Sequence, residues 1–543
     1  MGEFPFGYEK IAGTTWAYLS SLLMIALFFK FNRFWSVRNL DLLLIVLLVP
    51  GLLLVEGGIR QANSDAKQSI NQATTSQDGT QLSDSELPAP LDSEVPSRDP
   101  DSTPKNDIDS DMAPQPTDET ETTSLVNPFP TNPKTLQPIE LNTDIADASE
   151  QEGSGLQRIG YIWLFSVGFL ILIRLIIDPS LTRRPILEPN LSKGGLFFFG
   201  ASLMAILTAN LLLSDPTTGD IDHGKNAFKM IKREAADESD IEGLKRQGPG
   251  YPLFFMVPVL STFENGEEVL ETDVDEDANL NRFVLAAKIM AITSQSLIVL
   301  GLILFCYFNY DNLAVGVGTA SIYLMLPYTA LYTGHVTHTL PAALIVWAIV
   351  CFRRPWLAGV LVGLATGAAY YPIFLLPLWA SFYWERGVRG FVIGLLVGLS
   401  ICICGLIFTS IDGADFLFQL RQMFGFWQPR MTGLEGIWAL GWSSWWRLPI
   451  LVAFVAYAIS FVAWPTEKNI GTLVSYTASI LVAVQFWHGG SDGIGGGLYM
   501  AWYLPLLLLI VFRPNLTGRV ALSELREPVR IKPETAEDLL PAA

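Results

Sequence analysis

The sequence predicts an all-α, polytopic membrane protein with about thirteen transmembrane helices, and three observations carry this prediction. Half of the 543 residues are hydrophobic and only 16% are charged, against about 25% charged residues in globular chains. Apolar runs such as LDLLLIVLLVPGLLLV and IWLFSVGFLILIRLII recur along most of the chain, and most approach the length that crosses ~30 Å of hydrocarbon. Basic residues mark every predicted inner connection except the shortest, as the positive-inside rule requires.

Residues 1–60 contain the first two predicted spans. The link between them carries Lys30, Arg33 and Arg38, so we expect it to be cytoplasmic and the N-terminus to lie outside. The first span has no basic flank before it and no A-x-A-like site after it. We therefore expect a retained helix and not a cleaved signal peptide.

Residues 61–157 form an acidic insert that follows the second span. This segment holds 19 acidic and 4 basic residues, so it carries −15 of the chain's net charge of −18. It is rich in Ser, Thr and Pro and nearly free of aromatic residues, which leaves too little apolar surface to bury. We expect a disordered extracytoplasmic insert without chemistry of its own, and the acidic charge argues against nucleic acid as a partner.

Residues 158–195 hold the third span, near 161–177, and a loop with Arg183, Arg184 and Lys193 that is expected to be cytoplasmic. A transmembrane core then runs over residues 196–512. Its first span, near 196–213, leads to an outer loop over 214–283 that contains GDIDHGKNAF and GPGYPLFFMVPVL. The second of these stretches is too short to cross a membrane, so we expect a semi-embedded helix.

The rest of the core alternates between the two sides. One span joins TGHVTHT to CFRRPW, and LAGVLVGLATGAAYY with PIFLLPLWASFYW forms a short pair that breaks at Pro372. A loop over 410–446 and the turn HGGSDGIGGG are expected outside, and the basic tail 513–543 inside. The other predicted spans lie near residues 284–308, 313–332, 391–409, 448–464, 473–487 and 498–512.

Four cysteines fall inside or at the ends of apolar spans: Cys306, Cys351, Cys402 and Cys404. Their spacing matches neither a zinc site nor a disulfide framework. Cysteine is often buried as a small hydrophobic residue. We therefore predict no metal site and no disulfide at these positions.

Polar side chains with catalytic potential gather on the predicted outer side. Any one of them can be an ordinary loop residue, but ionisable groups that converge from several loops at membrane depth indicate a functional site. The set comprises all four histidines and six charged residues: His223, His335, His338, His488, Asp220, Asp222, Arg421, Arg430, Arg447 and Asp492.

Five tryptophans occur in the outer loop over 410–446. They fit an aromatic belt at the level of the lipid headgroups. They equally fit a platform that holds a lipid chain while Arg421, Arg430 or Arg447 binds its phosphate, because a guanidinium matches phosphate geometry. The sequence leaves both interpretations open.

An outward span, an acidic residue just beyond it, and then GPGYPLFF resemble the first periplasmic loop of polyprenol-dependent GT-C glycosyltransferases, among them the protein mannosyltransferase and aminoarabinose transferase families. The resemblance continues through NRFVLAAKIMAITSQSLIVLGLILFCYF and VGVGTASIYLMLPYTALYTGHVTHTLPAALIVWAIV. It is strongest where Gly359, Gly363 and Gly367 lead to a Tyr-Pro break. It covers residues 196–512 and leaves out the first three spans and the insert.

The resemblance implies a GT-C-like fold and a function. The chain would transfer a sugar from a polyprenyl-phosphate donor to a glycan, lipid or protein acceptor, on the extracytoplasmic face of a bacterial inner membrane. An acceptor hydroxyl needs a base, for which Asp222 is the first candidate and Asp220 the second. The candidates for binding the substrate and its lipid phosphate are Arg430, Arg421, His335, His338 and Tyr251.

The sequence implies no cofactor beyond the donor substrate. No Gly-rich loop for a nucleotide sugar follows a strand, and a divalent metal has no support. Two other functions compete with transfer. A transporter or flippase for a lipid-linked or anionic solute fits the broken, Gly-rich helices, although mid-membrane charges are scarce and no similar halves are visible. The third is a membrane scaffold without catalysis.

Overall fold

A computed structural model describes residues 13–78, 143–181, 189–234, 238–262, 276–425, 431, 434, 436–488 and 499–514. Every regular element in these ranges is a helix, which confirms the predicted all-α class. The chain divides into two units, one of Met1–Ala62 with Gln151–Ala543 and the other of Asn63–Glu150. Apart from the end of the second helix and the start of the third, which fall in the second unit, the features described below belong to the first unit.

The α-helices are, in chain order, α1 (Gly13–Phe28), α2 (Val37–Asp78), α3 (Thr143–Ile177), α4 (Lys193–Leu213), α5 (Thr218–Lys232), α6 (Glu238–Gln247), α7 (Gly250–Thr262), α8 (Glu276–Tyr310), α9 (Leu313–Met325), α10 (Pro327–Tyr332), α11 (Val336–Val350), α12 (Pro355–Ala368), α13 (Leu376–Tyr383), α14 (Val388–Thr409), α15 (Gly413–Phe424), α16 (Arg447–Ser460), α17 (Ile470–Val484) and α18 (Met500–Val511). Short 3-10 turns are η1 (Phe31–Arg33), η2 (Asp178–Ser180), η3 (Tyr371–Leu375), η4 (Gly436–Ala439) and η5 (Ser444–Trp446).

Several of these helices are long and apolar enough to cross a membrane, so the chain is a multi-pass membrane protein. In the described ranges five helical segments meet that length, within α2, α3, α4, α8 and α14, and nine shorter apolar helices accompany them. The count of about thirteen spans stays a prediction, because the shorter helices fall below the length of a full crossing.

Several predicted boundaries differ from the structure. The span predicted near 313–332 is two helices, since α9 ends at Met325 and Pro327 begins α10; proline lacks the N–H that would continue the first helix. The predicted loop over 410–446 contains α15. Helix α2 continues to Asp78 and α3 begins at Thr143, so both extend past the predicted edges of the insert. Residues 79–142 of the insert, residues 489–497 of the HGGSDGIGGG turn and residues 515–543 of the tail lie outside the described residues.

Helices α12 and α14 pack with their backbones almost in contact. A Cβ built on Gly359 would lie 2.1 Å from the Phe391 carbonyl oxygen, and one on Gly394 would lie 1.8 Å from that of Trp356. Small residues at four-residue spacing allow this approach between helices in lipid, where packing replaces the hydrophobic effect. The glycines noted in the sequence therefore serve this helix pair.

Buried charges join helices from the two ends of the chain. Arg174 of α3 pairs with Asp41 of α2 through two hydrogen bonds, of 2.6 and 2.9 Å, and with Asp178 at 2.8 Å. Arg513, just after α18, lies 3.2 Å from the second oxygen of Asp178. The Asp178 side chain is fully buried. This ionic cluster fastens α2 and α3 to the last helix of the predicted core.

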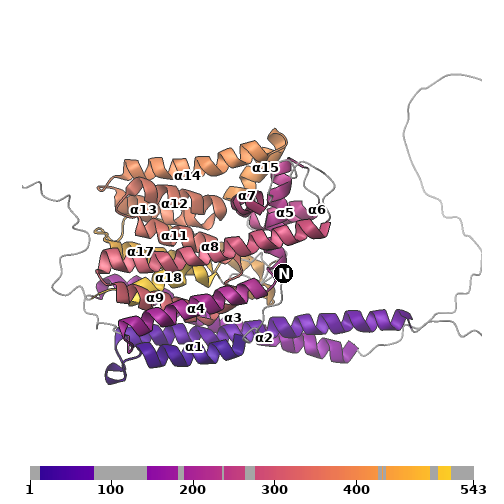
Figure 1. The fold of residues 1–543 in the computed structure, drawn as a ribbon, viewed down its shortest axis with the longest axis horizontal. Coiled ribbons are helices and arrows are strands. Elements are labelled where there is room, and N and C mark those ends of the chain that lie inside the picture. The colour runs from indigo at the N-terminus through magenta and orange to yellow at the C-terminus, as the bar shows by residue number, and fades with distance from the viewer. Residues whose placement is uncertain are drawn as a thin grey trace, which may run out of the picture. The chain divides into compact units, whose positions relative to one another are not determined.

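The predicted inner loops lie together. The Lys30 ammonium donates to Asn190 Oδ1 at 2.8 Å, and Arg38 donates to the Arg513 carbonyl at 2.5 Å. We call this the basic end of the unit. At the other end of α4 the short helices α5, α6, α7 and α15 lie close to one another (Figure 1), and we call it the α5 end. Three of the predicted inner segments therefore meet at this end, and the side of the membrane that they face stays a prediction.

Candidate functional site

The turn from α4 into α5 holds Asp220 in a fixed orientation. Thr217 caps α5, and its hydroxyl accepts a hydrogen bond from the Asp220 backbone N–H at 3.2 Å. The same hydroxyl donates to Asp220 Oδ2 at 2.7 Å. A threonine three residues before an acidic residue is a common way to satisfy the free N–H groups of a helix start. Local sequence therefore sets the rotamer of this carboxylate.

The second oxygen of Asp220 reaches another helix. Its Oδ1 accepts a hydrogen bond of 3.2 Å from the backbone N–H of Val336, the first residue of α11. A helix start presents unsatisfied N–H groups and a positive partial charge, which stabilise a carboxylate. Asp220 is only 2% exposed. The residue therefore connects α5 to α11 at the α5 end.

Asp222 occupies the opposite face of α5. The buried residues of this helix include Asp220, His223, Ala227 and Met230, which recur at helical spacing. Asp222 falls between them, its side chain is 59% exposed, and it pairs with Lys225 at 3.6 Å. Asp222, the first candidate base, therefore faces away from the interior of the unit, whereas Asp220, the second candidate, is buried inside it.

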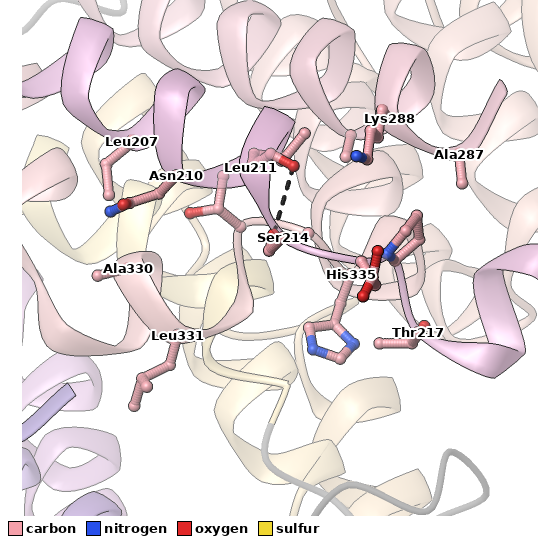
Figure 2. Close-up of a pocket in the computed structure, with 15 residues that line it drawn as sticks. Leu207, Asn210, Leu211, Ser214, Thr217, Ala287, Lys288, Ala330, Leu331 and His335 are labelled. Carbon is pink, nitrogen blue, oxygen red and sulfur yellow. Dashed lines mark hydrogen bonds between the residues drawn. The ribbon is translucent and has the colours of Figure 1, made fainter. Parts of the chain in front are cut away.

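A cavity of about 120 Å³ lies beside Asp220, between the end of α4, the middle of α8 and the turn before α11. Thr217, which donates to Asp220, lines it, and so does His335, which precedes Val336. Figure 2 shows Asn210, Lys288 and His335 around the turn at Ser214, which closes with a hydrogen bond of 3.3 Å to the Leu211 carbonyl. The cavity thus presents cationic or ionisable groups next to the buried carboxylate.

Lys288 is a cavity residue that the sequence analysis did not select. It is 8% exposed, and its ammonium donates to the Leu212 carbonyl at 2.7 Å. A lone lysine inside the apolar run LAAKIMAI was the available signal, because a charge in such a run is costly and usually functional. Its position beside the cavity could not be read from the sequence.

His335, His338 and His488 differ in their surroundings. His335 lines the cavity, whereas His338 is 2% exposed and its Nδ1 shares a hydrogen bond with the Tyr328 hydroxyl. The His488 ring bonds to the Tyr371 hydroxyl and lies 3.2 Å from that of Tyr499. His338 and His488 are therefore buried among aromatic side chains, and the His338 ring also lies 5.5 Å from that of His335, centroid to centroid.

The GPGYPLFF stretch becomes α7, the predicted short helix. A Cβ on Gly250 would lie 2.1 Å from the Gly367 carbonyl oxygen, so only glycine permits this contact with the end of α12. The Tyr251 hydroxyl donates to the Thr337 carbonyl at 3.1 Å, and the Tyr251 ring lies 5.2 Å from that of His223. Tyr251 thus supports the helix starts around Asp220 and does not line the cavity.

The arginine candidates lie elsewhere or outside the described residues. Arg421 is exposed on α15 and does not line the cavity, and Arg430 falls in a part of the chain that is not described. Arg447 is buried and donates to the Trp487 carbonyl at 3.0 Å. The neighbouring Trp445 and Trp446 are 71% and 64% exposed, the exposure expected of a belt facing lipid headgroups.

Metal-ligand geometry is not seen in the described ranges. No three His, Cys, Asp or Glu side chains there lie close enough together to hold a metal ion. The four cysteines are free, and only Cys306 and Cys402 are buried. Cys404 is exposed, which differs from the expectation of a buried residue, because its helix α14 shows most of one face to the surroundings.

A comparison with models of known protein families found no match, and a comparison with curated proteins found no similar sequence.

Proposed function

We propose that the chain is a membrane glycosyltransferase that uses Asp220 to deprotonate an acceptor hydroxyl and a lipid-phosphate sugar as donor. One observation carries the proposal: the buried carboxylate of Asp220, held by two hydrogen bonds, is bonded to Thr217 in the wall of a cavity that a lysine, a histidine and a second aspartate also line. This arrangement occurs at the end of the helices where the sequence topology expects the extracytoplasmic side. The resemblance of residues 196–512 to GT-C enzymes supports the same reaction.

Asp220 suits the role of base better than Asp222 in this arrangement. A general base must come within hydrogen-bond reach of the proton it takes, and Asp222 is exposed on the far face of α5. The Thr217 hydroxyl both lines the cavity and donates to Asp220 Oδ2. An acceptor hydroxyl that enters the cavity would replace Thr217 as the donor to that oxygen.

The proposed reaction is a direct displacement at the anomeric carbon. The acceptor O–H proton passes to Asp220 while the acceptor oxygen forms a bond to the anomeric carbon. The bond from that carbon to the phosphate oxygen breaks, and the lipid phosphate leaves with the electron pair. A nearby cationic side chain offsets the charge that develops on the phosphate. A single displacement inverts the anomeric configuration.

The test compares Asp220→Asn with Asp222→Asn in cells that lack the natural chain. Lipid-linked and surface glycans are analysed by mass spectrometry, with equal amounts of each variant verified in the membrane. Loss of a general base lowers a rate by about 100-fold or more, so we expect Asp220→Asn to abolish the product. Asp222→Asn should change the amount of product by no more than about twofold, because substitutions at exposed positions generally have small effects.

Each outcome decides a part of the proposal. If Asp220→Asn made the same products as the wild type, Asp220 would not be the base. If Asp222→Asn alone lost the product, the base would be Asp222, and α5 would have to rotate during the reaction.

A transporter is the second candidate, because two helices are interrupted at prolines. Helices α9 and α10 are separated at Pro327, and α12 and α13 are separated by a turn that contains Pro372. Discontinuous helices form the substrate sites of many transporters. A transporter would move a labelled lipid-linked solute across a proteoliposome membrane without forming a new glycosidic bond, so product analysis distinguishes the two functions.

A further inference from the structure

The backbone carbonyl of Met325 lies at the end of α9, where the helical hydrogen bonds stop. Leu326 leaves the helix with a ψ of 133°, and Pro327 begins α10. The last carbonyls of a helix have no N–H of a following turn to pair with. Met325 is 1% exposed, and an unsatisfied backbone group inside a membrane is costly. A donor from outside α9 is therefore needed at this break.

Trp16 of α1 supplies that donor. Its indole Nε1 donates to the Met325 carbonyl at 3.1 Å, and Trp16 itself is 5% exposed. The indole has a single N–H and no acceptor, so this bond uses its whole hydrogen-bonding capacity. Neighbouring helices commonly satisfy the backbone groups that a proline frees within a membrane. Helix α1 thus completes the break between α9 and α10.

Helix α1 also packs against the residues that follow the break. It contacts both α9 and α10, and a Cβ built on Gly13 would lie 2.9 Å from Leu331 Cδ2. Leu331 lines the cavity beside the turn from α4 into α5. Helix α1 therefore touches the wall of the candidate site as well as the break that sets the direction of α10.

Helix α10 and the turn after it lead directly to Asp220. One continuous segment contributes a third of the cavity lining, and Figure 2 labels both of its ends: Ala330, Leu331, Thr333, Gly334 and His335. The His335 N–H donates to the Tyr332 carbonyl at 3.1 Å. The next N–H, that of Val336, donates to Asp220 at 3.2 Å. The direction of α10 therefore sets the position of His335 and of one hydrogen bond to Asp220.

We propose that Trp16 is a positioning residue for the candidate site, because its bond to Met325 holds α10 and the wall segment 330–335 in place. The role falls to a helix outside residues 196–512, the part of the chain that the resemblance covers. The support of the wall is a property of the fold alone. Only its effect on product formation rests on the function proposed above.

The experiment measures how often the cavity wall opens, with a cysteine at position 333 as the reporter. Thr333 lines the cavity and is 6% exposed, so Thr333→Cys places a thiol of similar size where a reagent reaches it only when the wall moves. The full chain in detergent reacts with iodoacetamide, and mass spectrometry of its peptides gives the rate at each cysteine. Cys306, which is fully buried in α8, reports unfolding of the whole unit in the same sample.

Two tryptophan substitutions are compared in this background. Trp16→Phe keeps an aromatic ring and removes the N–H donor. Trp163→Phe is the matched control, because the Trp163 Nε1 of α3 donates to the Leu47 carbonyl of α2 at 2.6 Å, and neither residue lines the cavity. Each substitution removes one indole hydrogen bond to the backbone of a neighbouring helix.

We expect Trp16→Phe to raise the labelling rate at position 333 by about fivefold or more, the change in a conformational equilibrium that one lost buried hydrogen bond produces. Trp163→Phe should leave this rate within about twofold of the unsubstituted background, and Cys306 should stay protected in every variant. With threonine restored at position 333, Trp16→Phe should also lower the amount of glycan product, whereas Trp163→Phe should not.

An unchanged labelling rate at position 333 in Trp16→Phe would overturn the proposal, and so would an equal rise in Trp163→Phe. A parallel rise at Cys306 would also overturn it, because Trp16 would then stabilise the whole unit and not this wall.

Asp220→Asn separates this inference from the proposed function. If Trp16→Phe opens the wall while Asp220→Asn still makes glycan product, the positioning role holds and the catalytic assignment fails. If Asp220→Asn abolishes the product and Trp16→Phe leaves the wall closed, only the present inference fails.

Discussion

The choice between Asp220 and Asp222 shows what single residues reveal before a structure is known. The sequence placed both at the outer end of α4, and the structure puts both in α5 at one end of the unit. The sequence could not decide which of the two aspartates faces inward, because that depends on where α5 begins. The Thr217-x-x-Asp220 spacing was the usable signal, since it resembles the start of a capped helix. His335 was identified from the sequence, whereas Lys288 was not.

Thr217 provides a test of this local arrangement. Replacing it with Val removes the cap of α5 and the hydroxyl that donates to Asp220. We expect a loss of about 1 kcal/mol in unfolding free energy, the usual cost of a lost N-cap, whereas Thr217→Ser should restore most of it. Unfolding in detergent, followed by tryptophan fluorescence, measures both variants. A serine variant as unstable as the valine variant would mean that the methyl group of Thr217 matters and not its hydroxyl.

At the scale of elements, prolines and helix caps explain which helix boundaries were predicted correctly and which were missed. The break between α12 and α13 was predicted at Pro372, but the equivalent break at Pro327 was overlooked inside an apolar run. Helix α15 was missed although Asp412 caps its start and Gly425, with φ of 61°, ends it. Those are ordinary helix boundary signals. They were obscured by the tryptophan-rich composition of the loop.

Two glycines one turn apart in α14 test the close packing of α12 against α14. A Cβ on Gly394 would lie 1.8 Å from the Trp356 carbonyl oxygen, whereas the nearest atom to a Cβ on Gly390 lies at 3.7 Å. We expect Gly394→Ala to lower stability by about 1–3 kcal/mol through overpacking. Gly390→Ala should be neutral or slightly stabilising, because alanine favours the helix.

Thermal unfolding in a single detergent compares the two alanine variants directly. The identical chemical change at both sites removes helix propensity from the comparison. Equal melting temperatures would show that α12 and α14 do not pack as closely as described.

At the scale of the molecule, the all-α class predicted from the sequence is confirmed, the number of spans and their orientation stay predictions, and the neighbours of each helix could not be predicted. Nearly every span is uniformly apolar, so the pattern carries little information about which faces meet. The predicted basic loops do lie together at one end. The resemblance left α1 to α3 outside the core, yet Arg174 and Asp178 join α2 and α3 to Arg513, just after α18. Such a partnership between distant residues leaves no local trace in a sequence.

Arg174→Gln tests whether this ionic cluster holds the unit together. The substitution leaves the buried carboxylates of Asp41 and Asp178 without their shared guanidinium. Removing one partner of a buried ion pair typically costs about 3–5 kcal/mol. Arg60→Gln is the control, because the pair of Arg60 with Glu56 is exposed and should contribute less than about 1 kcal/mol. If Arg174→Gln melted at the same temperature as the control, the ionic cluster would not stabilise the unit.

The link between Asp178 and Arg513 also constrains how the chain assembles during its synthesis. A ribosome that adds about 5–20 residues per second needs on the order of half a minute to travel from one residue to the other. During that interval α3 is already made, but the arginine that completes the environment of Asp178 does not yet exist. Until then Arg174, one turn earlier in the chain, is the partner that Asp178 has available. The end of the last described helix therefore completes the burial of a charge carried by one of the first.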